Sequence, residues 1–189
     1  SRKFQYTRIT KGATAKTYQE PLQWLIQNGL VLPCHDNRDG KNTARQQINL
    51  HLYPVDTGLC TRMLKIPAYQ LLTGEESIAC TETFLAQQFI QNGYTLSYWS
   101  SGNQAEVPFL LSKNNHFIAV DYRITPHQKC RNLMRLQDSC NHFDNSYISD
   151  QTDSPCSLEQ INQMYLLSTE DFKNKEHYRI VPVYSAFCI

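Results

Sequence analysis

Four charged residues in the middle of the sequence have the types and spacing needed for phosphate chemistry. Glu82 lies in a stretch of helical periodicity, and Glu106, Asp121 and Arg123 lie in segments with strand-like patterns. Carboxylate oxygens suit Mg²⁺, which takes one or two carboxylates and keeps several waters. Asp121 and Arg123 are two residues apart, so on a strand their side chains leave the same face. A cation beside the carboxylates could orient a water or stabilise charge on a phosphate in the transition state.

The same residues have a simpler structural explanation. Acids and bases alternate in this way on many strands, where they form cross-strand ion pairs. Spacing alone therefore favours an ion pair over a metal site.

Helical and strand-like segments alternate around these residues. Ile78, Glu82, Leu85 and Phe89 share one helical stripe between a capping box at residues 73–76 and a stop at Gly93. We also predict helices over 17–28 and 127–137, with Pro21 in the first turn of the former. Strands are predicted over 94–99, 106–111, 116–124, 164–167 and 179–183. Residues 50–59 should form a short edge strand or connector, and residues 138–160 an irregular insertion. This order predicts an α/β fold with a mixed sheet flanked by helices, preceded by a small helical N-terminal segment.

Length and composition bound the class of protein. The chain has 189 residues, of which 41% are hydrophobic and 19% charged, which excludes general disorder. No run approaches the roughly 18 apolar residues of a membrane span, and no signal segment opens the chain. The seven cysteines form no Cys-x-x-Cys pair, so we expect reduced thiols and a cytoplasmic protein.

Positive charge is concentrated near the start of the chain. Residues 1–66 carry ten Lys and Arg against four acids, and the first sixteen residues hold five bases and no acid. Such an arm could meet phosphate or an acidic partner, although an ordinary solvated face is the commoner explanation. The bases that we single out for nucleic-acid binding are Arg2, Lys3, Lys129 and Arg131.

Several ordered segments resemble the C-terminal domain of the DUF4143 family, a family of unknown function usually attached behind an AAA-type ATPase module. Residues 81–88 (TETFLAQQ) resemble the family's TENxVAQE helix, and residues 105–110 (AEVPFL) resemble AEVDFL. Residues 118–123 (IAVDYR) stand where the family has IPIEVK. Residues 52–59 and 181–187 are similar to its LYFLDTGLL and IPLYAAF segments.

That family resembles the restriction-endonuclease-like PD-(D/E)xK nucleases, which implies a degenerate site here. Glu82, Asp121 and Arg123 would be the catalytic positions, and Glu82, Glu106 and Asp121 the metal ligands. Pro108 stands where the family has a metal-binding Asp, and it has no ligand atom in its side chain. Arg123 replaces the lysine and keeps its charge but cannot act as a base.

The resemblance implies two domains and one main function. We expect a basic, helical, winged-helix-like segment over 1–66 and a nuclease-like domain over 67–189. The resemblance also implies an AAA-type ATPase module upstream in the same polypeptide. The chain starts at Ser1 and has no phosphate loop, so we expect no ATP site in this chain itself. The module would be catalytically degenerate and would bind nucleic acid or regulate.

Two alternatives stay open at this point. One is an active Mg²⁺-dependent DNA endonuclease, and the other is a protein-interaction domain with no nucleic-acid role. Whether the chain is an enzyme is not decided by the sequence. We expect Mg²⁺ if the chain is an active nuclease, and otherwise no cofactor.

Overall fold

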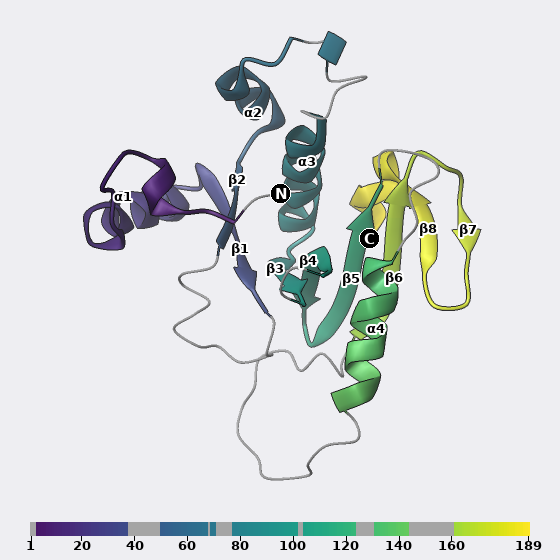
Figure 1. Cartoon of the computed structure of the whole chain (residues 1–189). Helices are drawn as coiled ribbons and strands as arrows, with labels where there is room; N and C mark the ends of the chain where they lie inside the picture. Colours follow the sequence, from purple (N-terminus) through teal and green to yellow (C-terminus); the bar gives the residue numbers. More distant parts are fainter. Residues whose placement is uncertain are drawn as a thin grey trace. The chain divides into compact units, whose positions relative to one another are not determined.

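A mixed β-sheet with helices makes up the computed structural model, and this confirms the α/β class. The structure describes residues 3–37, 50–67, 69–70, 77–101, 104–123, 131–143 and 161–189, with only the backbone described for 77 and 141–143. The eight strands follow the order β2-β1-β3-β4-β5-β6-β8-β7 (Figure 1). Among the strand pairs, β1–β3, β5–β6 and β6–β8 are parallel, and β3–β4, β4–β5 and β7–β8 are antiparallel. None of the helices in the described part of the chain has the length and apolar content to cross a bilayer.

The chain divides into two compact units. The first comprises Ser1–Cys34 and Asn49–Gln87, and the second His35–Ile48 and Gln88–Ile189. Strand β1 (Val31–Asp36) and helix α3 (Ser77–Gln91) both run from the first unit into the second. The division at residue 66 into a winged-helix-like and a nuclease-like domain stays a prediction.

The first unit contains the 3₁₀ turn η1 (Tyr6–Arg8), helix α1 (Ala15–Gln27), strand β2 (Leu50–Pro54) and helix α2 (Thr57–Leu64). Helix α1 ends where predicted, with Gly29 at a φ of +67° behind it. Pro21 was expected in the first turn, but α1 begins at Ala15 and Pro21 lies inside it. Helix α2 was not predicted as a helix. The Asp56 carboxylate caps it by accepting the Leu59 N–H at 2.8 Å.

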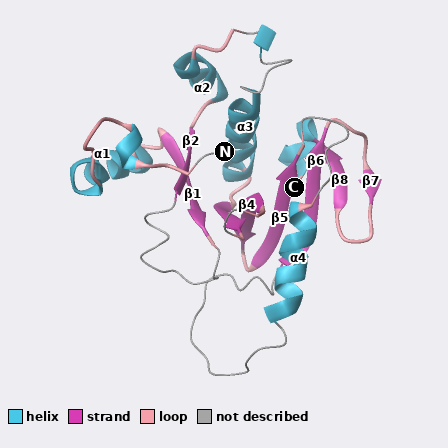
Figure 2. Ribbon diagram, viewed as in Figure 1, coloured by secondary structure: helices cyan, strands magenta, loops and turns pink. Residues whose placement is uncertain are grey.

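The second unit is built on β3 (Thr95–Ser100), β4 (Glu106–Lys113), β5 (His116–Tyr122), β6 (Ile161–Ser168), β7 (Lys173–Asn174) and β8 (Arg179–Pro182). The hairpin of β7 and β8 lies at one end of the sheet, and the 3₁₀ helix η5 (Val183–Cys188) follows β8 (Figure 2). Each longer predicted strand is present with slightly shifted ends. The capping box at residues 73–76 and most of the predicted insertion lie outside the described residues.

Helices cover both faces of β4 in the second unit. Near the end of α3, the Phe89 ring meets the Phe109 ring edge-on at 5.4 Å between centroids. The next residue, Leu110, joins Ala119 in a core cluster with Leu133 and Leu136 of α4 (Asn132–Phe143). Because neighbouring strand residues point to opposite faces, α4 and the end of α3 lie on opposite sides of β4.

Helix α4 corrects the sequence prediction at both ends. It was expected over 127–137, with irregular chain after it, but it runs from Asn132 to Phe143. Its apolar stripe continues from Leu133 and Leu136 to Cys140, which packs against the same core cluster. Burial of this stripe outweighs the polar composition of residues 138–143, which suggested a loop.

Candidate functional site

Asp121 is an acid of the predicted site whose pKa departs clearly from its ordinary value. It lies near the end of β5, and only 7% of its surface is exposed. Its Oδ1 accepts the backbone N–H of Tyr122 at 2.8 Å, and its Oδ2 accepts Nδ2 of Asn132, at the start of α4, at 3.2 Å. Burial raises the pKa of Asp121 to about 6, the two hydrogen bonds limit the rise, and the charge of Glu106 adds to it. Both oxygens of this carboxylate are therefore engaged inside the protein.

The register of β4 changes beside the predicted metal position. Leu110 pairs with Ser97 of β3, but Val107 pairs with Trp99, so β4 carries one extra residue between these pairs. Val107 and Leu110 accordingly belong to the same core cluster although they are three residues apart. Strict alternation would put residues two apart, such as Glu106 and Pro108, on one face of the strand, but it does not hold across such an irregularity. The influence of Glu106 on Asp121 shows only that these two carboxylates are near each other.

Arg123, directly after β5, forms an ion pair that was not predicted. Its Nη2 donates to Oε1 of Glu170, and the two side chains are 13% and 24% exposed. Oε2 of Glu170 accepts Nζ of Lys173 at 3.1 Å. The hydrogen bond from Lys173 and the charges of Lys173 and Arg123 lower the pKa of Glu170. The guanidinium of Arg123 is thus paired with the Glu170 carboxylate of the same chain.

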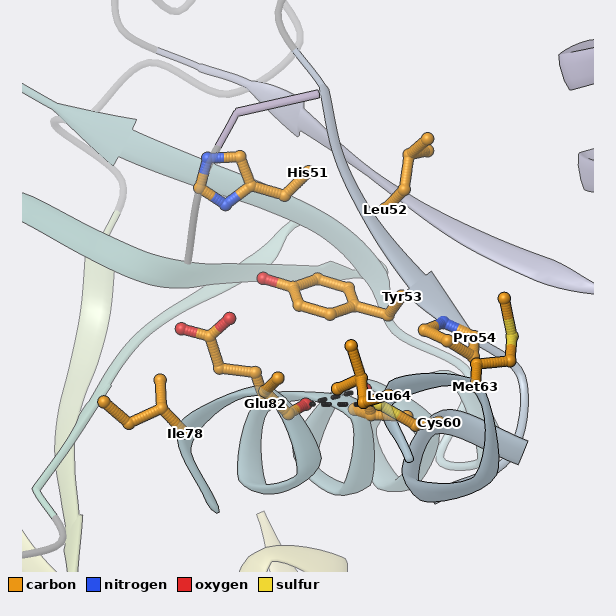
Figure 3. Close-up of a pocket in the computed structure, with 11 residues that line it drawn as sticks. His51, Leu52, Tyr53, Pro54, Cys60, Met63, Leu64, Ile78 and Glu82 are labelled. Atoms are coloured by element: carbon orange, nitrogen blue, oxygen red, sulfur yellow. Dashed lines mark hydrogen bonds between the residues drawn. The ribbon is translucent and has the colours of Figure 1, made fainter. Parts of the chain in front are cut away.

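Glu82 belongs to the first unit and lines a pocket there. It is 3% exposed, and the pocket has a volume of about 500 Å³. Figure 3 shows the Glu82 carboxylate pointing toward the Tyr53 hydroxyl, with the His51 ring beyond it. The remaining walls are mostly apolar and come from β2, α2 and α3: Leu52, Pro54, Cys60, Met63, Leu64, Ile78, Ala79 and Thr83.

His51 contributes a neutral imidazole to this pocket. The side chain is 1% exposed, and burial, reinforced by the positive charge of Lys3, lowers its pKa to about 4. At neutral pH the pocket therefore combines apolar walls with a neutral ring, a phenol and one carboxyl group. Pockets of this size and character are typical of sites for small molecules.

The four predicted site residues are divided between the two units. Glu106, Asp121 and Arg123 lie in the second unit and Glu82 in the first, so neither unit alone brings all of them together. Within the described ranges, no three His, Cys, Asp or Glu side chains are grouped to hold a metal ion. Catalysis by Glu82, Asp121 and Arg123, and Mg²⁺ binding by Glu82, Glu106 and Asp121, stay predictions.

The predicted nucleic-acid contacts are only partly described. Arg2 and Lys129 lie outside the described residues, Lys3 is half-buried, and Arg131 is exposed just before α4. The sequence did not indicate two of the observed contacts, the hydrogen bond from Asn132 to Asp121 and the ion pair of Arg123 with Glu170. The partners are 11 and 47 residues apart, so no local pattern in the sequence indicates these contacts.

These observations define the class of protein as a mixed α/β fold with buried polar residues at the end of β5. Residues 79–169 match a family model described as a domain of unknown function (DUF4143). The match begins in α3, ends directly after β6 and covers just under half of the chain. Comparison with curated proteins and with solved structures gave no match.

Proposed function

We propose that this chain carries a nuclease-derived module that no longer cleaves and that acts by binding nucleic acid. What carries the proposal is the state of Asp121, whose two oxygens accept hydrogen bonds from Tyr122 and Asn132 in a buried position. A carboxylate that binds a metal ion needs a negative charge and oxygens directed at the ion. Here burial opposes the charge, and both oxygens are directed at N–H donors of the chain.

Two neighbouring residues support the loss of cleavage. Pro108 offers no ligand atom, and the Arg123 guanidinium pairs with Glu170 in place of a phosphate. This donor set does not fit a resident Mg²⁺, so we derive no reaction step through one. Asp121 and Arg123 have structural partners of the kind found in ordinary ion-pair and hydrogen-bond networks.

Positive charge in the first unit supports the binding part of the proposal. Arg8, Lys11 and Lys16 are exposed around η1 and the start of α1, in a stretch of sixteen residues without an acid. Bases grouped in this way attract phosphates without reading a base sequence. The family resemblance adds an AAA-type ATPase module of the same polypeptide as the partner that this domain would serve, and we extend that arrangement to this chain.

The first experiment tests cleavage. The chain is incubated with plasmid and linear DNA in Mg²⁺ and in Mn²⁺, and we expect no cutting above that of an Asp121→Ala variant. Metal-dependent cutting that Asp121→Ala abolishes would establish the active endonuclease instead.

The second experiment tests binding with a charge-matched control. We expect Lys11→Glu to weaken binding to a labelled duplex at low salt several-fold and to reduce its salt dependence. Lys175→Glu makes the same charge change at an exposed position between β7 and β8, and we expect little effect there. Absence of binding by the unmodified chain would favour a protein-interaction domain.

A further inference from the structure

The pocket of the first unit has an apolar mouth and a carboxylate in its interior. Met63 and Leu64 of α2 and Ile78 of α3 line the pocket and are exposed, so they mark its side toward solvent. Glu82, one helical turn after Ile78, lines it from a buried position, as does Tyr53 of β2. The Glu82 carboxylate is directed at the Tyr53 hydroxyl (Figure 3). A molecule that enters the pocket would therefore pass apolar side chains before it reaches the carboxylate.

Glu82 determines the sign of the charge inside the pocket. Among the described residues that line the pocket, Glu82 is the one acid, and none is Lys or Arg. His51 adds no positive charge at neutral pH, because burial lowers its pKa to about 4. The charge of Lys3 acts on His51, but Lys3 is not one of the lining residues. The two oxygens of a carboxylate can accept about four hydrogen bonds, so a partner of Glu82 within the chain leaves capacity for a ligand.

The charge and the walls together select one class of ligand. An anion would meet the Glu82 carboxylate without a basic side chain among the described lining residues to compensate its own charge. A wholly apolar molecule would cover the carboxylate without giving it a hydrogen bond, and burial of a charge in that way is costly. A protonated amine supplies the opposite charge and N–H donors, and a hydrocarbon skeleton behind it suits the apolar walls.

We propose that this pocket binds a small organic cation, a protonated amine on an apolar body. The ammonium group donates to the Glu82 carboxylate, and the apolar body packs against Met63, Leu64 and Ile78. The volume of about 500 Å³ lies within the range of small-molecule sites. Glu82 then anchors an ammonium group and not Mg²⁺. The site does not depend on the nucleic-acid binding proposed above, because none of the bases used there lines the pocket.

The test uses the full chain and phenethylamine as the probe, with phenethyl alcohol and hydrocinnamate as its neutral and anionic counterparts. NMR of isotope-labelled methionine methyl groups reports where each compound binds. Met63 lines the pocket, whereas the other two methionines, Met134 and Met164, lie in the second unit. We expect the amine to shift the Met63 signal saturably and to leave the other two unchanged. The alcohol should bind weaker by about tenfold or more, and hydrocinnamate should not bind.

A matched pair of variants tests the role of the carboxylate. Glu82→Gln keeps the size of the side chain and removes its charge, and it should weaken binding of the amine by about tenfold or more. Glu20→Gln makes the same change at an exposed acid of α1 in the same unit and should leave the affinity unchanged. The three compounds on the unmodified chain decide the question even if Glu82→Gln fails to fold. The proposal is overturned if the amine does not shift the Met63 signal, if the alcohol or hydrocinnamate binds as tightly as the amine, or if folded Glu82→Gln binds the amine unchanged.

Discussion

Replacing Asp121 with Asn should stabilise the chain at neutral pH, because the folded state holds this acid at a high pKa. The pKa of Asp121 rises from 3.8 to about 6 on folding. Below pH 3.8 the carboxyl is protonated in both the folded and the unfolded state, so it does not change the free energy of unfolding. Between pH 3.8 and 6 the unfolded chain releases the proton and the folded chain keeps it, so the free energy of unfolding falls as pH rises. At 1.36 kcal/mol per pH unit, the loss reaches about 3 kcal/mol and stays constant above pH 6.

The Asn side chain keeps the shape of the Asp side chain and removes the charge. Its Oδ1 can still accept the Tyr122 N–H, and rotation of the Asn132 amide lets that residue serve as acceptor for the new Nδ2. We expect Asp121→Asn to gain up to about 3 kcal/mol over the unmodified chain at pH 7 and little at pH 4, less any mismatch in the hydrogen bonds.

Urea unfolding at pH 4.5, 5.5, 6.5 and 7.5 measures this difference. The comparison must be between variant and unmodified chain at each pH, because His51 acts in the opposite sense. Its lowered pKa removes stability as pH falls from 6.5 toward 4. Asp138→Asn, at an exposed acid of α4, is the matched control and should give no such pH-dependent gain. A variant that is equally destabilised at all four pH values would refute the burial of a high-pKa carboxyl.

Two further changes test neighbouring contacts. Glu106→Gln removes a negative charge that raises the pKa of Asp121, so NMR titration of the Asp121 carboxyl should give a pKa below about 6; an unchanged value would mean that the two carboxylates do not interact. Asp56→Ala removes the acceptor for the Leu59 N–H at the start of α2 and should cost ~1 kcal/mol in urea unfolding, whereas Asp56→Asn should cost only a few tenths; equal losses in both would show that the cap is not the cause.

Periodic patterns predicted the elements that bury a regular apolar face. The helix over 75–92 and the strands over 94–99, 106–111 and 116–124 are present as α3, β3, β4 and β5. Burial of alternating or helically spaced apolar residues dominates the stability of these segments, and it is visible in the sequence. Helix α2 was missed because Gly58 suggested a turn, although Asp56 three residues before Leu59 was a helix-start signal.

The environment of the candidate site could not be predicted in the same way. The sequence showed that Asp121 and Arg123 carry opposite charges two residues apart, and this suggested a ligand and a phosphate clamp. Which groups satisfy these charges depends on tertiary contacts, with Asn132 on α4 for one and Glu170 beyond β6 for the other. Each partner belongs to a segment whose approach to β5 is set by packing of the core and not by local propensity.

The irregularity in β4 shows why a count of residues along a strand is not enough to assign a site. Pro108 lies in the stretch where the pairing with β3 shifts by one residue, and proline within a sheet is confined to edges and bulges because it lacks an N–H. Pro108 therefore coincides with a change in the backbone that re-aims the side chains before it. An aspartate at position 108 would add a carboxylate without making the register regular, so the direction of its side chain would still be set by the irregularity between Val107 and Leu110.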